Sequence, residues 1–153
     1  MKTRVLMVCL GNICRSPLAE GILKSKVDPN KVSIDSAGTG SWHVDHLPDP
    51  RSISVGKRYG VDITGQRGRQ FEPADFDRFD HIYVMDTSNY DDVIAQARNE
   101  EDKNKVQLIL DEIFPGEKVD VPDPYHGGEH GFENVFQMLD EACEIIASKL
   151  NKE

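Results

Sequence analysis

The amino-acid sequence predicts an α/β domain with a parallel sheet, because short apolar runs alternate with longer segments of helical periodicity. A second observation is the length, since 153 residues suit one domain with a core of its own. A third is uniformity, because no internal repeat, linker or low-complexity tract divides the chain. We therefore expect residues 1–153 to form a single domain.

The chain opens with a strand, a tight loop and a helix. Residues 5–8 are apolar, too few for a core helix and rich in strand formers. Gly11 and Asn12 tolerate left-handed backbone, and Pro17 stands where a first helical turn would begin. The helix then extends to about residue 28. Its apolar residues recur with helical spacing at Leu18, Ala19, Ile22, Leu23 and Val27. In the first helix, Glu20 is expected to lie off the apolar face.

The next elements are a strand, a long loop and a second helix. Residues 32–36 alternate as the second strand, and residues 37–50 form a loop that carries Trp42. Residues 51–59 form a helix ended by a glycine.

The middle of the chain is predicted to hold the third strand. Residues 61–71 are irregular and basic, and residues 73–79 form a helical turn or two. Residues 81–86 are the third strand. Thr87 or Ser88 can cap the helix that follows, which extends to about residue 98.

The last part of the chain supplies the fourth strand and a long final helix. The acidic run at residues 100–102 is expected to be a solvated loop, and residues 105–110 form a strand. A long loop rich in proline and glycine spans residues 114–131. Residues 132–150 keep a helical period, and Cys143 lies on their apolar stripe, where a core position is expected.

Composition excludes several classes of protein. A net charge of −9 leaves no basic stripe to neutralise the phosphates of a nucleic acid. No apolar stretch approaches membrane-spanning length, and no secretory apolar region opens the chain. Three sparse cysteines do not make a disulfide framework. We expect a cytoplasmic protein that binds neither nucleic acid nor membrane.

Polar and reactive residues follow each predicted strand. In an open parallel sheet the ligand lies at the carboxyl ends of the strands. Residues 9–16 follow the first strand, Ser36 ends the second, Asp86 closes the third and Asp123 lies after the fourth. We therefore expect these residues to meet in one site.

The loop after the first strand has the composition of an anion site. A loop between a strand and a helix N-terminus points its N–H groups inward and forms a nest for an anion. Cys9 at the bottom of this nest should be a thiolate, and Arg15 should grip an oxyanion in a bidentate way. Asp123, between two prolines, is a candidate acid for a departing alcohol and then a base toward water. Ser16 can donate to the thiolate.

The sequence around this loop resembles a known family. Residues 8–17 (V-C-L-G-N-I-C-R-S-P) resemble the phosphate-binding loop of the low-molecular-weight protein tyrosine phosphatases, and residues 123–125 (D-P-Y) resemble their general-acid loop. Further matches are Asp35-Ser36-Ala37, Arg69-Gln70, Met85-Asp86 and Ser88-Asn89. The resemblance covers essentially the whole chain, in the same order and spacing.

The resemblance implies hydrolysis of phosphotyrosine through a phosphocysteine intermediate. It makes Cys9 the nucleophile, Arg15 the phosphate clamp and Asp123 the acid and then the base. Trp42 and Tyr125 would wall a slot that holds a phosphotyrosine ring by stacking and is too deep for phosphoserine. The Trp42 loop resembles the eukaryotic-type branch. The family fold is a three-layer domain, a four-stranded parallel sheet with helices on both faces.

The resemblance also assigns the rest of the loop. Asn12, Ser16 and Ser36 would form a hydrogen-bond network that supports it. For Cys14 the alternatives are packing and a redox role, and the family suggests a reversible Cys9–Cys14 disulfide that protects the nucleophile. The residues that would bind phosphate or support the loop are Leu10, Gly11, Asn12, Ile13, Cys14, Ser16 and Ser36.

The resemblance also implies the ligands. Phosphotyrosine proteins would be the substrates, inorganic phosphate or another oxyanion would occupy the site, and neither metal nor cofactor would be needed. Trp42 and Tyr125 at an exposed rim could support weak self-association. His126 and His130 have the spacing of no standard metal site.

The sequence departs from the family pattern at three positions. Gln66 stands where many relatives carry a histidine, so the loop would lack support from an imidazole. His126 follows Tyr125 where a second tyrosine is common, and His46 lies in the variable wall loop. These residues bear on substrate preference, not on the reaction.

The residues present argue against two rival functions. An arsenate reductase on a similar fold would need two further cysteines to carry a disulfide outward, and residues 80–98 contain none. A non-catalytic phosphate-binding module should lack the nucleophile or the acid, and both are present. Two smaller questions stay open: Asp86 either caps a helix or orients Arg15, and Arg67 and Arg69 are either surface charge or ties to the nest.

Overall fold

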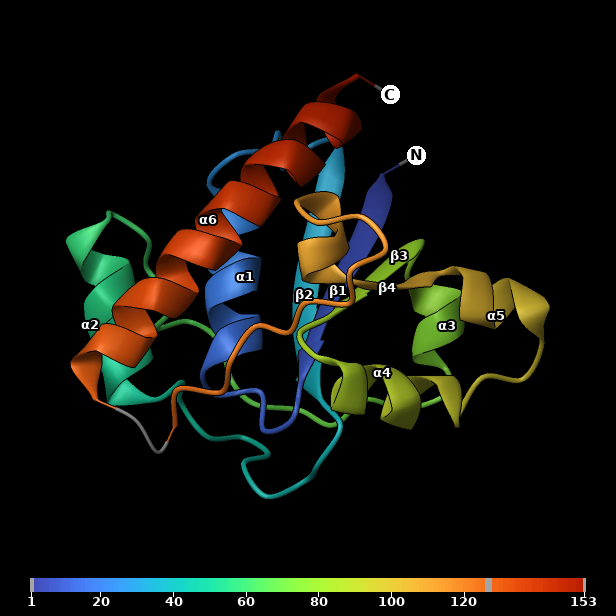
Figure 1. Ribbon diagram of the computed structural model, residues 1–153, viewed down its shortest axis with the longest axis horizontal. Coiled ribbons are helices and arrows are strands. Elements are labelled where there is room, and N and C mark those ends of the chain that lie inside the picture. The colour runs from blue at the N-terminus through green and yellow to red at the C-terminus, as the bar shows by residue number, and fades with distance from the viewer. Residues whose placement is uncertain (1, 126–127, 153) are drawn as a thin grey trace.

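A computed structural model describes residues 2–125 and 128–152 of the protein. Within these residues, four parallel strands form one sheet in the order β2-β1-β3-β4 (Figure 1). The strands are β1 (Thr3–Cys9), β2 (Val32–Gly38), β3 (His81–Val84) and β4 (Val106–Leu108). This sheet confirms the predicted α/β class.

The sheet is organised around β1. This strand pairs with β2 from Thr3 to Cys9 and with β3 from Val5 to Val8, so both of its edges are filled. Residues 5–8 are fully buried as a result. Because β1 is central, Cys9 at its carboxyl end lies in the middle of the edge where ligands bind in such sheets.

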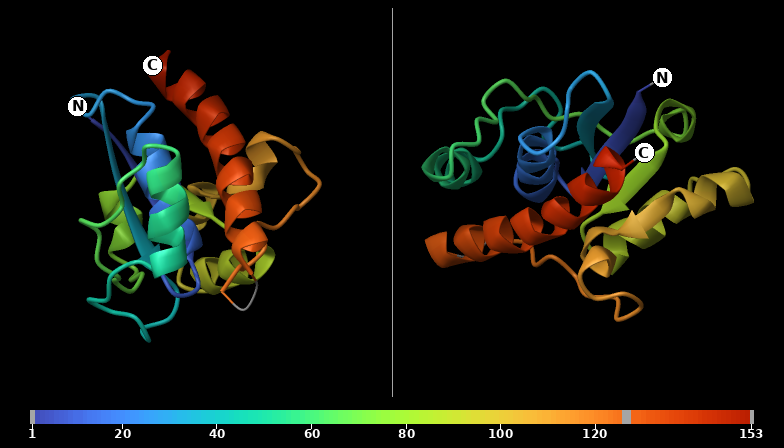
Figure 2. Two further views of the ribbon diagram at one scale, coloured as in Figure 1. Left: turned by 90° about the vertical axis from the view of Figure 1, so that its left-hand side faces the viewer. Right: turned by 90° about the horizontal axis from the view of Figure 1, so that it is seen from above.

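Helices cover both faces of the sheet, as Figures 1 and 2 show. The face with Val5 and Met7 packs on α1 (Arg15–Lys24), α2 (Pro50–Arg58) and α6 (Glu129–Asn151). The face with Leu6 and Val8 packs on α3 (Asp75–Arg78) and α4 (Thr87–Ile94). The short α5 (Glu100–Asn104) precedes β4, and a 3-10 helix, η1 (Ile109–Glu112), follows it. The period-two alternation of β1 thus builds two apolar cores.

The acidic run at residues 100–102 is helical, so its prediction as a solvated loop was wrong. The Asn99 side chain caps α5 by accepting a hydrogen bond from the Asp102 N–H at 2.8 Å. Asp102 is only 3% exposed and accepts from Arg98 Nε at 2.8 Å. A cap and an ion pair one turn apart therefore stabilise a helix that has no apolar periodicity.

Several predicted boundaries shift by a few residues. The helix after β3 ends at Ile94, and its cap is Asp86 instead of Thr87 or Ser88. The fourth strand ends at Leu108, where η1 begins. The first helix ends at Lys24, and the last begins at Glu129. None of the helices in residues 2–125 and 128–152 is both long and apolar enough to cross a membrane.

A buried carboxylate ties α3 to the loop before it. Asp75 has no exposed surface, and its two oxygens accept hydrogen bonds from both Arg69 Nη atoms at 3.1 Å. Arg69 also contacts Asp35 on β2, where Nε lies 3.1 Å from Oδ2. The open question about Arg69 is therefore answered: it fastens this loop to β2 and α3. Arg67 donates to carbonyls of its own loop, those of Thr64 and Gln66.

Replacing Asp75 should destabilise the fold more than replacing a neighbouring acid. We expect Asp75→Ala to lower the unfolding free energy by about 3 kcal/mol, because it leaves Arg69 without its buried partner. Asp77→Ala is the matched control, since Asp77 lies on the same helix but its side chain is 68% exposed beside Arg98. Urea denaturation followed by circular dichroism measures both; equal losses would contradict the role given to Asp75.

Candidate active site

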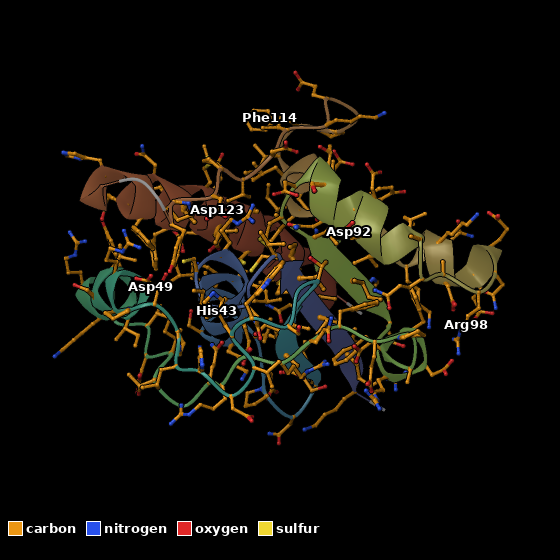
Figure 3. The ribbon with its side chains drawn as sticks, turned by 90° about the horizontal axis from the view of Figure 1, so that it is seen from below. His43, Asp49, Asp92, Arg98, Phe114 and Asp123 are labelled. Carbon is orange, nitrogen blue, oxygen red and sulfur yellow. The ribbon has the colours of Figure 1, made fainter. Side chains whose placement is uncertain are left out.

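A cavity lies at the carboxyl edge of the sheet. In Figure 1 the loops that follow β1 and β2 at this edge lie below the two strands. Figure 3 views this edge and shows His43, Asp49 and Asp123 around the end of α1. The loops after β1 and β2 and the loop before α6 contribute the walls. The lining residues are Cys9, Leu10, Gly11, Ile13, Cys14, Arg15, Trp42, His43, Asp123 and Tyr125.

Two groups hold the Cys9 sulfur at the bottom of the loop. The Asn12 N–H donates to the Cys9 sulfur at 3.3 Å, and Ser16 Oγ lies 2.9 Å from the same sulfur. Asn12 has a left-handed backbone (φ 56°), as the sequence suggested, which turns its N–H inward. A Cβ on Gly38 would lie 2.8 Å from the Leu10 carbonyl, so only glycine lets β2 approach the loop this closely.

A chain of hydrogen bonds supports the loop from behind. Asn12 Nδ2 donates to Ser16 Oγ at 2.8 Å and to Ser36 Oγ at 2.9 Å. Because Ser16 Oγ accepts from Asn12, its own proton is available for the Cys9 sulfur at 2.9 Å or for the Ala37 carbonyl at 3.5 Å. The structure therefore brings the residues expected to form a network together behind Cys9.

Glu20 continues this chain, which sequence reasoning missed. It was expected off the apolar face, yet it is only 4% exposed and accepts from Ser36 Oγ at 2.7 Å. Burial raises the pKa of Glu20, although hydrogen bonds from Lys24 and Ser36 oppose the shift. The sequence signal for this role of Glu20 was its position one helical turn after Ser16. Gln66 lies beside it and donates to the Pro17 carbonyl at 3.0 Å, so an amide supports the loop here.

Arg15 is almost completely buried at the rim of the loop, with 2% of its surface exposed. Its Nη1 donates to Asp86 Oδ2 at 2.7 Å and to the Val121 carbonyl at 2.9 Å. Burial opposes its charge, but the charges of Cys9, Asp86 and Asp123 outweigh burial and raise the pKa of Arg15. The guanidinium is thus a fixed cation beside the sulfur.

Asp86 performs both roles that the sequence left open. Its Oδ1 caps α4 by accepting from the Asn89 N–H at 2.7 Å, and its Oδ2 binds Arg15. One carboxylate at the end of β3 thereby starts a helix and orients the guanidinium.

Asp123 lines the cavity on the loop before α6. Its side chain is 43% exposed, with Oδ2 3.8 Å from Arg15 Nη2. Its Oδ1 accepts from the Tyr125 N–H at 3.0 Å. The carboxyl group therefore faces both solvent and the anion site.

The other two cysteines differ from Cys9 in their surroundings. Cys14 is 4% exposed in the same loop; burial and the charges of Asp49, Cys9 and Asp123 raise its pKa to about 12. It is therefore a protonated thiol at neutral pH. Cys143 lies fully buried in the core under α1, where Ala19 is its neighbour.

Three aromatic side chains border the mouth of the cavity. Trp42 is 68% exposed and Tyr125 is 39% exposed, and both line the cavity. The sequence gave no role to His43, which lines it too, with its ring 6.3 Å from that of Tyr125. His43 Nδ1 is 3.3 Å from His46 Nδ1, so His46 supports the wall from outside. His126 lies outside the described residues.

Within residues 2–125 and 128–152, no group of three or more His, Cys, Asp or Glu side chains is placed to hold a metal ion. The described residues that line the cavity include a thiol, an arginine and a carboxyl group.

The sequence and fold are similar to those of known phosphatases. The family model for low molecular weight phosphotyrosine protein phosphatase matches residues 4–153. The chain belongs to this family. A putative low-molecular-weight protein-tyrosine-phosphatase from Synechocystis is 44% identical, with 98% of each chain covered.

Solved structures agree with this assignment to the low-molecular-weight protein tyrosine phosphatases. A protein tyrosine phosphatase from Entamoeba histolytica, with Hepes in its active site, superposes with a TM-score of 0.91 at 38% identity, covering 99% of this chain and 98% of the other. The tyrosine phosphatase Wzb from Escherichia coli K30, in complex with sulphate, gives 0.85 at 33% identity, with 98% and 99% covered. The protein is thus a hydrolase of the protein-tyrosine-phosphatase class.

Proposed function

We propose that Cys9 is the nucleophile of this phosphatase. Its sulfur attacks the phosphorus of a phosphotyrosine, a sulfur–phosphorus bond forms, and the bond to the phenolic oxygen breaks. The observation that carries this proposal is the position of the Cys9 sulfur, which accepts from the Asn12 N–H and contacts Ser16 Oγ beside the buried Arg15. Arg15 and the loop amides hold the phosphoryl oxygens as their charge redistributes.

Asp123 serves as the acid and then as the base. In its protonated form it gives its proton to the departing phenolic oxygen. Water then attacks the phosphocysteine and passes a proton to Asp123, the sulfur–phosphorus bond breaks, and inorganic phosphate leaves. Ser16 stabilises the departing sulfur by hydrogen bonding. The exposed position of Asp123 over the cavity, near Arg15, supports both steps.

The substrates we propose are proteins that carry phosphotyrosine, and small aryl phosphates. Trp42 and Tyr125 border the cavity and would stack on the phosphotyrosine ring. His43 adds a third wall with hydrogen-bonding capacity. Inorganic phosphate and other oxyanions should occupy the loop. In support, the Entamoeba phosphatase holds Hepes, a sulfonate, in its active site, and the Escherichia coli phosphatase is in complex with sulphate.

Hydrolysis of phenyl phosphate without added metal tests the assigned roles. Cys9→Ser should lose all measurable activity, and Asp123→Ala should lose about 10²- to 10⁴-fold in kcat, the usual contribution of acid–base catalysis. Cys143→Ser, in the core, is the matched control and should retain activity. An inactive wild-type enzyme, or an active Cys9→Ser variant, would contradict the proposal.

We also propose that Cys14 guards the nucleophile against oxidation. Hydrogen peroxide oxidises the Cys9 thiolate to a sulfenic acid and releases hydroxide; the Cys14 thiol then displaces water to form a disulfide. Both cysteines are unpaired and line one cavity, and the high pKa of Cys14 leaves Cys9 as the first target.

Mass spectrometry after mild peroxide treatment tests the guard. The wild-type enzyme should form a Cys9–Cys14 disulfide and recover its activity with dithiothreitol. Cys14→Ser should instead accumulate sulfinic or sulfonic acid on Cys9 and stay inactive, while Cys143→Ser should behave as wild type. Only overoxidised Cys9 in the wild-type enzyme would count against the idea.

The remaining proposals concern where the enzyme works. We place it in the cytoplasm, because its cysteines are unpaired. A net charge of −9 argues against nucleic-acid or membrane surfaces as partners. The exposed Trp42 and Tyr125 could support weak self-association.

A further inference from the structure

An acid–arginine pair at the start of α2 joins the phosphate loop to the loop that carries Asp123. We propose that Arg51, held in place by Asp49, is a positioning residue that aims Asp123 at the leaving group. This inference rests on the proposed role of Asp123 as the general acid.

Asp49 anchors one end of the connection to the phosphate loop. Its own N–H donates to the Ile13 carbonyl at 2.8 Å, and Ser52 Oγ donates to the Cys14 carbonyl at 3.4 Å. Asp49 is only 8% exposed and is the N-cap of α2. The first turn of α2 is thereby fixed relative to the nucleophile.

Asp49 then fixes the direction of the Arg51 side chain. Its Oδ1 accepts from the Arg51 backbone N–H at 2.8 Å and from Nε at 3.1 Å, and its Oδ2 accepts from Nη2 at 3.1 Å. Although burial opposes it, these bonds lower the pKa of Asp49 below its usual value. A guanidinium bound in this bidentate way has little rotational freedom left.

Arg51 reaches across to the loop that carries the acid. Its Nη2 donates to the Tyr125 carbonyl at 2.8 Å. Its guanidinium carbon lies 4.5 Å from the Phe132 ring centroid and 5.6 Å from that of Tyr125. Ring contacts of this length are attractive, so the guanidinium is held against the start of α6 as well.

Tyr125 carries the effect to the acid itself. While its carbonyl accepts from Arg51, its N–H donates to Asp123 Oδ1 at 3.0 Å. A single residue therefore links the guanidinium to the carboxyl group whose direction matters for proton transfer. Arg51 does not line the cavity, so it acts on Asp123 through this loop and not by contact within the cavity.

This arrangement predicts a dependence on the leaving group. A phenol as basic as tyrosine departs slowly unless it is protonated, whereas a strongly acidic phenol leaves as its anion without an acid. A misplaced Asp123 should therefore slow poor leaving groups selectively. A general loosening of the phosphate loop should slow all leaving groups alike.

The experiment measures kcat/KM for phenyl, 4-nitrophenyl and 2,4-dinitrophenyl phosphate, because this ratio reports the first step alone. We expect Arg51→Gln to lose about 10- to 100-fold on phenyl phosphate, the cost of a small misplacement, and little on the dinitrophenyl ester. Arg51→Lys keeps the positive charge but not the bidentate geometry of the guanidinium, so it should recover part of the lost kcat/KM. Thermal unfolding should show that each variant is folded.

Arg58→Gln is the matched control. Arg58 lies on the same helix, is exposed and pairs with Glu133 at 3.6 Å, so its replacement removes the same charge without touching Tyr125. It should leave all three values unchanged.

Asp123→Ala sets the reference slope against leaving-group acidity. Suppose that Asp123→Ala gives a steep slope. If Arg51→Gln then lowers kcat/KM equally for all three esters, or does not lower it at all, only the positioning role of Arg51 is overturned. A flat slope for Asp123→Ala would overturn the acid role of Asp123, and the positioning role with it.

Discussion

The shape of the phosphate loop depends on the side chain of Asn12. Its Nδ2 group donates to Ser16 on α1 and to Ser36 on β2, and its Oδ1 accepts from the Arg69 N–H at 3.0 Å. The same residue adopts the left-handed backbone that turns its N–H toward the Cys9 sulfur. Hydrogen bonds buried in this way are costly to break, so they hold the loop in one shape.

We expect this acidic protein to hold an anion, because the charges around the cavity are arranged locally. The net charge is −9, yet Arg15 is buried beside Cys9 and fixed by Asp86. Asp86 satisfies one edge of the guanidinium, and the other edge lies toward Asp123. The cation and the inward amides act over a few ångströms in a poorly solvated cavity, where they outweigh distant surface charge.

The sequence predicted the fold and the reactive residues of the site better than it predicted the contacts that support the site. Strand and helix periodicity predicted the parallel sheet, and the motifs around Cys9 and Asp123 identified the family. Glu20 could not be placed, because burial of a lone carboxyl group depends on Ser36 from another strand. The helix at residues 100–102 depends on a cap and on the buried Asp102, which apolar periodicity does not reveal. The link through Arg51 spans residues 51 and 125, a contact visible only after folding.

In the proposed reaction the phosphoryl group passes through the sulfur of Cys9. Rapid mixing with 4-nitrophenyl phosphate, a denaturing quench within the first turnover and mass spectrometry of the peptides test this step most directly. We expect a phosphoryl group on Cys9, and none on Cys14 or Cys143. Turnover of the ester with no phosphorylated Cys9 at any quench time, or with the phosphoryl group on another residue, would contradict it.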